Sequence, residues 1–182
     1  MPGAGKINSI EQFKGGQSNP PYKIVTESKN LVLRRKPPGK LLPSAHAVDR
    51  EYKVITALYE TDVPVPKTYG LCEDDEIAGT AFFVMDFLDG DLFWNPMIPS
   101  LSNQDRTEIY QNKNKTLALL HGVDYKKIGL EDFGKPGNYV ARQVARWSKQ
   151  YRASETDDIE AMNNLIDWLP NNIPDDDETS ID

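Results

Sequence analysis

A short run of glycine and small polar residues near the N-terminus has the composition of a phosphate-binding loop. Gly15 and Gly16 leave the backbone free to approach a ligand closely, and Ser18 and Asn19 add hydrogen-bond donors. No Gly-Lys-Ser/Thr sequence follows and no helix is expected directly behind this loop, so a Walker A phosphate loop is excluded. Two interpretations stay open, a loop that covers phosphates and a plain turn in a hairpin.

Residues 31–35, Leu-Val-Leu-Arg-Arg, alternate as a strand and carry a second candidate group. Alternation places Val32 and Arg34 on one face, so Arg34 is expected to hold phosphates and Val32 to cover a ring of the ligand. A cation in a cleft needs an acidic partner, and Glu51 beside the apolar stripe of the next helix is the best candidate. The alternatives are a solvated cation on an edge strand and a helix-surface pair of Glu51 with a neighbouring cation.

The apolar run at residues 81–85, Ala-Phe-Phe-Val-Met, has the pattern of a strand buried on both faces. Polar residues and glycine return directly after it. Backbone donors and acceptors from Asp86 to Leu88 are therefore expected to hydrogen-bond a flat heterocycle. The alternative is an ordinary exit loop.

A sheet and several helices are needed to position these groups, and the periodicity predicts both. The first part predicts a hairpin, a helix capped by Ser44 and a second pair of strands around an acidic turn at 73–76. The hairpin strands are 22–26 and 30–35, the helix is 44–60, and the later strands are 67–72 and 80–88. The second part predicts helices at 102–121, capped by Ser102, at 139–152 and at 158–169.

These elements indicate an α+β fold in two lobes. Residues 1–88 are expected to form a β-rich nucleotide-binding lobe with a hinge near 86–88. Residues 89–182 are expected to form a partial helical lobe with an acidic C-terminal tail. A cleft between two such lobes is a natural ligand site.

The composition limits the classes of ligand and partner that the chain is expected to bind. The 182 residues have a net charge of −7, but residues 1–60 carry 10 Lys and Arg against 5 Asp and Glu. This basic first third fits an anionic ligand, whereas the acidic remainder argues against a nucleic-acid binder. A single cysteine, Cys72, excludes a disulfide framework and fits a reducing compartment. No apolar run approaches the ~20 residues of a membrane span, so we expect a cytoplasmic protein with no membrane partner.

The order of these motifs resembles the aminoglycoside phosphotransferase family, which has a protein-kinase-like fold. More narrowly, residues 34–46 and 147–156 resemble the kinase-like domain at the N-terminus of acyl-CoA dehydrogenase family members 10 and 11. The resemblance implies ATP as cofactor and phosphoryl transfer to a small hydroxylated metabolite. It places Arg34 at the phosphates with Glu51 as its partner, residues 86–88 at the adenine and residues 15–19 over the phosphates. Some relatives are mitochondrial.

One part of the family pattern is missing. The resemblance implies a His-Gly-Asp run, a following Asn and a second Asp, which orient the hydroxyl and hold Mg²⁺. The run at 121–124, His-Gly-Val-Asp, lies one helix too early and is interpreted as a helix end. We therefore expect a domain truncated before its catalytic loop, with no catalytic or metal-binding residue, that does not turn over alone. The alternative is a non-catalytic binding or dimerising module that associates through the exposed, truncated helical lobe.

Overall fold

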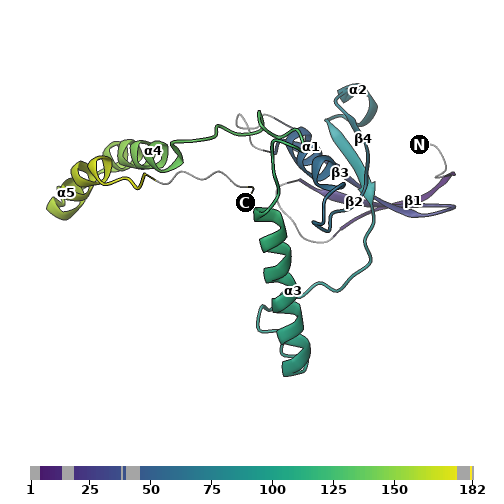
Figure 1. The fold of residues 1–182 in the computed structure, drawn as a ribbon. Coiled ribbons are helices and arrows are strands. Elements are labelled where there is room, and N and C mark those ends of the chain that lie inside the picture. The colour runs from purple at the N-terminus through teal and green to yellow at the C-terminus, as the bar shows by residue number, and fades with distance from the viewer. Residues whose placement is uncertain (1–4, 14–18, 38, 40–45, 176–180, 182) are drawn as a thin grey trace. The chain divides into compact units, whose positions relative to one another are not determined.

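The structure is a computed structural model and describes residues 5–13, 19–37, 39, 46–175 and 181 (Figure 1). The chain divides into two compact units, Met1–Val123 and Asp124–Asp182. The expected division near residue 88 would lie within the first unit, and it stays a prediction.

Five strands of the first unit form one antiparallel sheet in the order β1-β2-β3-β5-β4. Their bounds are β1 (Ile7–Gln12), β2 (Pro21–Thr26), β3 (Asn30–Arg35), β4 (Thr68–Cys72) and β5 (Phe82–Asp86). The predicted hairpin and the second pair of strands are confirmed. The edge strand β1 was not predicted, because its two apolar residues, Ile7 and Ile10, stand three apart and do not alternate as in a strand.

The acidic segment between β4 and β5 is a short helix rather than an open turn. Helix α2 spans Asp75–Ala78, and the Asp74 carboxylate accepts a hydrogen bond from the Glu76 backbone N–H at its start. Gly79 ends the helix with a φ of 78°, a left-handed conformation that glycine adopts without steric cost. The helix thus makes the reversal that the acidic sequence was expected to make.

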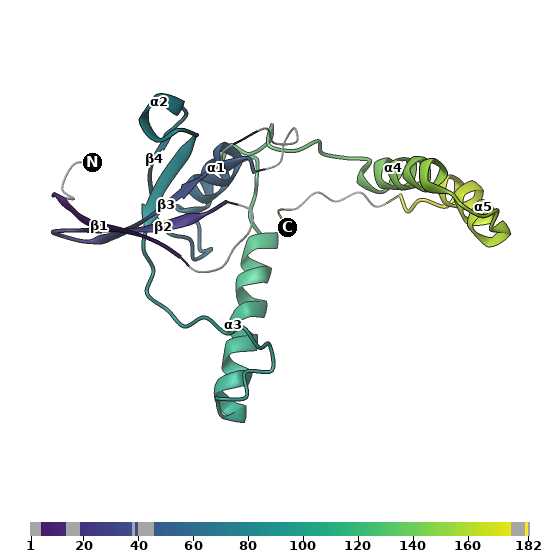
Figure 2. The same ribbon diagram turned by 180° about the vertical axis from the view of Figure 1, so that it is seen from behind.

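The strand β5 is buried on both faces, as its continuous apolar run predicted. On one face, Val84 belongs to a cluster with Ile24 and Leu31. On the other face, the fully buried Phe83 ring lies 5.9 Å from the Tyr52 ring of helix α1 (Val48–Leu58). Helix α1 contacts β4 and β5 and so lies against one face of the sheet (Figures 1 and 2).

The start of α1 corrects the predicted cap. The helix begins at Val48 with Ala47 at the cap position, and no side chain caps it. His46 has a φ of 61°, a left-handed conformation that a helix running through this position would not allow. Ser44, the expected cap, lies outside the described residues.

Helix α3 (Asn103–His121) begins as predicted. The Ser102 hydroxyl accepts a hydrogen bond from the Asp105 backbone N–H at 3.2 Å and donates one to the Asp105 carboxylate at 2.7 Å. Gly122 follows the last helical residue, so the run at 121–124 includes a helix end, as interpreted from the sequence. No helix in the described part of the chain is long and apolar enough to cross a membrane.

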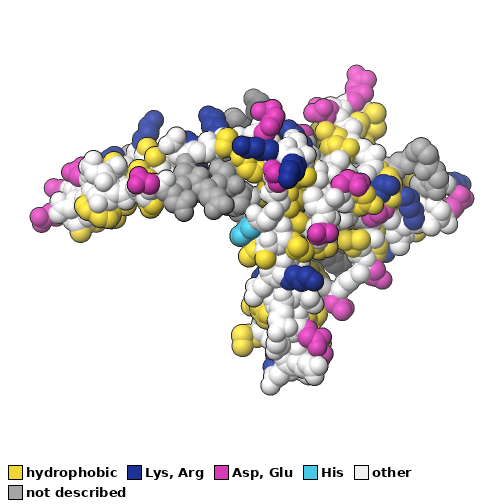
Figure 3. All heavy atoms as spheres, in the orientation of Figure 1, with side chains coloured by type: hydrophobic (Ala, Val, Ile, Leu, Met, Phe, Trp, Pro, Cys, Tyr) yellow, Lys and Arg dark blue, Asp and Glu magenta, His cyan; other side chains and the backbone are white. Residues whose placement is uncertain are grey.

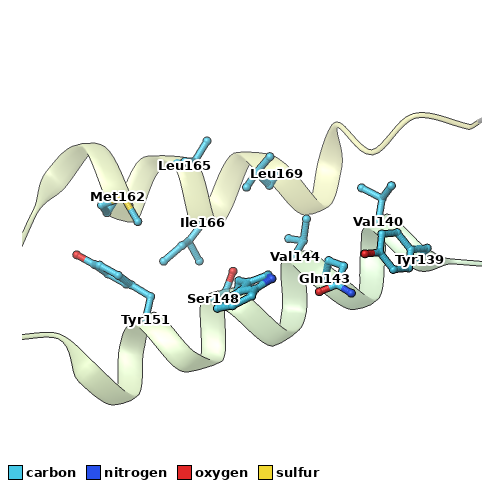
Figure 4. Close-up of a pocket in the computed structure, with 11 residues that line it drawn as sticks. Tyr139, Val140, Gln143, Val144, Ser148, Tyr151, Met162, Leu165, Ile166 and Leu169 are labelled. Carbon is cyan, nitrogen blue, oxygen red and sulfur yellow. The ribbon is translucent and has the colours of Figure 1, made fainter. Parts of the chain in front are cut away.

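The second unit contains two amphipathic helices that face each other across an apolar groove. These are α4 (Tyr139–Ser154) and α5 (Glu160–Trp168), followed by a 3₁₀ turn at Leu169–Asn171. The groove has a volume of about 380 Å³, and side chains such as Val144 and Ile166 point into it (Figure 4). Neither helix has a fully buried residue, and both Trp147 and Trp168 are 56% exposed. Hydrophobic side chains are correspondingly visible on the surface of this pair (Figure 3).

Candidate functional site

An ion pair between Arg34 and Glu51 joins the sheet to α1. The Arg34 guanidinium donates from Nε to Glu51 Oε2 at 2.9 Å and from Nη2 to Oε1 at 2.6 Å. This bidentate geometry fixes the plane of the guanidinium, which a single contact would leave free to rotate. The side chains are 28% and 35% exposed, so the pair is partly shielded from water but still reachable by a ligand.

The sheet topology explains why the pair forms. Arg34 lies on β3, which has β2 on one side and β5 on the other, so it is not on an edge strand. It stands opposite Phe83 in the ladder, and directly opposed residues of antiparallel strands share a face. Phe83 contacts α1, so Arg34 faces α1 as well. The two alternatives from the sequence, a solvated edge cation and a local surface pair of Glu51, are therefore wrong.

Val32 shares this face two residues before Arg34. It is only 8% exposed and stands opposite Met85 of β5. Its burial gives this part of the face an apolar surface beside the charged pair. That combination of an apolar surface and a fixed cation suits a ligand with a flat ring and an anionic group.

Asn19 is the described member of the predicted loop. Its Oδ1 lies 3.2 Å from Nδ1 of His46, just before α1. Gly15, Gly16 and Ser18 lie outside the described residues. The sequence reasoning missed His46 as a site residue, because no spacing rule connects it to Asn19, 27 positions away.

The predicted hinge is only partly available to a ligand. The Asp86 backbone N–H donates to the Lys67 carbonyl at 2.9 Å, and the Asp86 carboxylate accepts from the Tyr69 hydroxyl at 2.6 Å. The Asp86 N–H is therefore used within the protein, which leaves the backbone of the next two residues for the expected contacts. Leu88, the last of them, is 65% exposed.

An aromatic contact at the hinge was not found from the sequence. The Phe87 ring stacks on that of Phe13, with centroids 6.2 Å apart, and Lys23 Nζ lies 4.4 Å from the centroid of the Phe87 ring. Phe13 directly precedes the predicted loop. The contact therefore ties the hinge to the strand that leads into that loop.

The charged groups of the described residues form no evident metal centre. In the described part of the chain, no group of three or more His, Cys, Asp or Glu side chains is arranged to hold a metal ion. The Asp124 carboxylate accepts hydrogen bonds from the backbone N–H groups of Lys126 and Lys127 at 3.2 Å each. The Lys127 N–H contributes most to holding the pKa of Asp124 below its ordinary value. Asp124 thus stabilises a turn after α3.

The fold corresponds to a known class. The chain matches the model of the Phosphotransferase enzyme family over residues 9–181, and it belongs to that family. Its α+β fold is that of the kinase-like aminoglycoside phosphotransferases. Wild-type aminoglycoside 2′-phosphotransferase-IIIa, in its GDP complex, shares this fold with a TM-score of 0.59 at 13% identity, over 91% of this chain and 53% of that chain.

Two similar proteins are more closely related in sequence. A Ralstonia eutropha crystal structure, provisionally named an aminoglycoside phosphotransferase, is 50% identical with a TM-score of 0.78, over 96% of this chain and 50% of that chain. Mouse acyl-CoA dehydrogenase family member 10 is 48% identical over 163 residues, or 90% of this chain and 15% of that protein. These matches confirm the resemblance seen in the sequence. The chain spans half of the Ralstonia chain and a smaller part of the mouse protein.

Proposed function

We propose that this chain binds ATP at the face of β3 that carries Arg34, as the nucleotide-binding part of a kinase that phosphorylates a hydroxyl of a small metabolite. The bidentate Arg34–Glu51 pair is the observation that carries this proposal. Family membership supports it, as does the GDP complex of the structural neighbour of the same fold.

The pair leaves the guanidinium able to bind phosphate. An arginine has five N–H donors, and Glu51 takes one from Nε and one from Nη2, so three remain. Phosphate oxygens are acceptors that match the planar donor pattern of arginine. Glu51 thus holds the cation in a fixed plane, which lowers the conformational entropy that the Arg34 side chain would lose on binding a phosphate.

The other predicted contacts extend this site. Val32 offers an apolar surface for the base, the backbone at residues 87 and 88 offers polar groups at its edge, and Asn19 offers an amide. The Asp86 N–H is not among these groups, because Lys67 accepts from it.

We further propose that the chain alone binds nucleotide without turning over. Phosphoryl transfer needs a carboxylate at the acceptor hydroxyl and oxygen ligands for Mg²⁺. The sequence contains no His-Gly-Asp run, and the described residues include no group of three or more His, Cys, Asp or Glu side chains arranged to hold a metal ion. Detection of phosphate transfer from labelled ATP to an acceptor by the chain alone, abolished by Arg34→Ala, would contradict this part.

The direct test is calorimetric titration of Mg-ATP into the purified chain. Arg34→Ala should weaken binding by about tenfold or more, since it removes charge-assisted hydrogen bonds. Arg146→Ala is the matched control, because it removes an equal charge at an exposed position on α4. Equal affinity of wild type and Arg34→Ala would refute the proposed site, provided that circular dichroism shows both to be folded.

Self-association is a second candidate function, favoured by the groove of the second unit. Its lining is apolar and partly exposed. Helix α4 carries four basic residues and no acidic one, whereas α5 carries two acidic residues and no basic one. In a two-fold dimer in which α4 contacts the partner's α5, these opposite charges would lie together at two equivalent contacts.

Sedimentation velocity tests this second candidate. A dimer of wild type that Leu165→Glu converts to monomer would support it, since the charge would enter an apolar interface. Lys149→Glu, at an exposed position of α4, would report on the charge pairing. A wild-type chain that stays monomeric at tens of micromolar would refute it.

A further inference from the structure

His46 closes a ring of contacts around the Arg34–Glu51 pair. Asn19 leads into β2, where Pro21 stands opposite Arg34 in the ladder. Arg34 is bonded to Glu51, whose backbone N–H donates to the Ala47 carbonyl at 3.2 Å in the first turn of α1. His46 precedes Ala47 and returns to Asn19 at 3.2 Å. Three segments far apart in the sequence thus meet at one corner of the sheet.

The contact between Asn19 and His46 pairs an acceptor with a donor. The Asn19 atom that faces His46 is the carbonyl oxygen Oδ1, which can only accept a hydrogen bond. With the amide in this orientation, a hydrogen bond between the two side chains has Nδ1–H of His46 as its donor. The Asn19 amide then keeps its oxygen toward His46 and has its Nδ2 donors to offer to another group.

We propose that His46 is a positioning residue that orients the Asn19 amide, so that Asn19 meets a phosphate as a donor. An asparagine amide can present either an acceptor or a donor to a ligand, and a phosphate at neutral pH attracts only the donor. By fixing Oδ1, His46 removes the unfavourable orientation before the ligand arrives. This inference rests on the proposed nucleotide site and assigns His46 a role within it.

The backbone conformation of His46 also supports its role as a positioning residue. Its φ of 61° lies in the left-handed region, which is sterically unfavourable for most residues other than glycine. The His46 carbonyl accepts from the Val48 N–H at 2.9 Å, which holds this conformation at the start of α1. The strained turn directs the imidazole to Asn19 instead of continuing the helix.

Substitutions at position 46 can distinguish the effect of the side chain from the effect of the backbone conformation. His46→Gly accommodates the positive φ but removes the donor. His46→Asn accommodates it and retains a donor nitrogen two bonds from Cβ, as Nδ1 is. His121→Asn is the matched control, because His121 is the other histidine and is exposed at the end of α3.

The affinities to compare are those for Mg-ATP, tripolyphosphate and adenosine, measured by calorimetry on the full chain. His46→Gly and Asn19→Ala should each weaken Mg-ATP and tripolyphosphate by about tenfold and leave adenosine within about twofold, because only phosphate meets the amide. The double variant should be no weaker than Asn19→Ala, since His46 acts through Asn19. His46→Asn should bind within about threefold of wild type, and His121→Asn should bind as wild type does.

Nitrogen NMR of the histidines gives a readout that does not depend on nucleotide. His46 should be the Nδ1–H tautomer in wild type and should lose that preference in Asn19→Ala. A protonated Nε2 with a bare Nδ1 would overturn the inference, as would equal weakening of adenosine and ATP in His46→Gly. If wild type binds ATP and His46→Gly binds it as well, the inference alone fails. If wild type binds no ATP, the proposed function fails, and the anion-binding role of Asn19 with it.

Discussion

Removing one partner of the Arg34–Glu51 pair tests whether the pair holds the sheet and α1 together. Glu51→Gln keeps the size of the side chain but removes its charge and one strong acceptor. The pair has two charge-assisted hydrogen bonds at 2.9 and 2.6 Å, and such bonds contribute about 1.5–3 kcal/mol each when buried. The side chains are 28% and 35% exposed, and solvent screening reduces this to a coupling of about 1–2 kcal/mol in total.

A double-mutant cycle isolates that coupling from other effects of each change. The variants are Arg34→Met, Glu51→Gln and the two combined, since Met keeps most of the apolar stem of arginine. Native-state hydrogen exchange of the β3 and β5 amides is the appropriate assay, because it reports on the first unit and not on the second. The losses of protection free energy in the two single variants should sum to more than the loss in the double variant, and the difference is the coupling of about 1–2 kcal/mol.

The same variants connect stability to ligand binding. Without Glu51 the guanidinium keeps its charge but loses its fixed plane, so Glu51→Gln should weaken Mg-ATP by about tenfold, which is about 1.4 kcal/mol. A coupling below about 0.3 kcal/mol would show that water, and not Glu51, satisfies Arg34. Unchanged ATP affinity in Glu51→Gln would show that phosphate binding does not need the fixed guanidinium, and the argument for the site would fail.

Three further outcomes follow from single contacts. Phe83→Ala should destabilise the first unit by about 3–4 kcal/mol in urea unfolding, because a fully buried ring leaves a cavity between the sheet and α1. Ser102→Ala should cost about 1 kcal/mol of the same free energy, whereas Ser102→Asp should retain the cap of α3; equal losses would contradict the cap. The pKa of Asp124, measured by carboxyl NMR, should lie below the ordinary value and rise toward it in an unfolded chain. The ionised Asp124 carboxylate stabilises the folded chain above the unfolded pKa, and this contribution is lost as the pH falls through the folded pKa. Asp124→Asn should therefore remove this carboxylate's contribution to the change of unfolding free energy with pH.

Strong local patterns account for what the sequence predicted. The alternation at residues 31–35 and the apolar run at 81–85 identified β3 and β5, because a strand with a buried face leaves a period of two. Ser102 with Asp105 identified the start of α3, since both halves of that cap lie within one turn. The Arg34–Glu51 pair was predicted because strand alternation puts Arg34 on the same face as Val32 and because Glu51 stands beside the apolar stripe of the next helix.

Weak local patterns and long-range contacts account for what the sequence did not predict. Strand β1 is almost fully exposed, and its place in the sheet depends on pairing with β2 and not on its own pattern. The start of α1 depends on the left-handed backbone at His46, and no capping side chain in the sequence indicates where the helix begins. The contact between His46 and Asn19 joins two segments that only the sheet and α1 bring together.

The proposed nucleotide site and the apolar groove belong to different units, which makes the two candidate functions separable. Arg34, Glu51, Asn19 and His46 all lie before residue 123, whereas the groove is lined by α4, α5 and the first residue of the 3₁₀ turn that follows α5. A chain that binds ATP with Arg34 and remains monomeric supports the first function alone. A chain that dimerises through Leu165 and ignores ATP supports the second alone. Arg34→Ala changes only the first unit and Leu165→Glu only the second. If either variant lost both ATP binding and dimerisation, the cause would be unfolding and not a shared site.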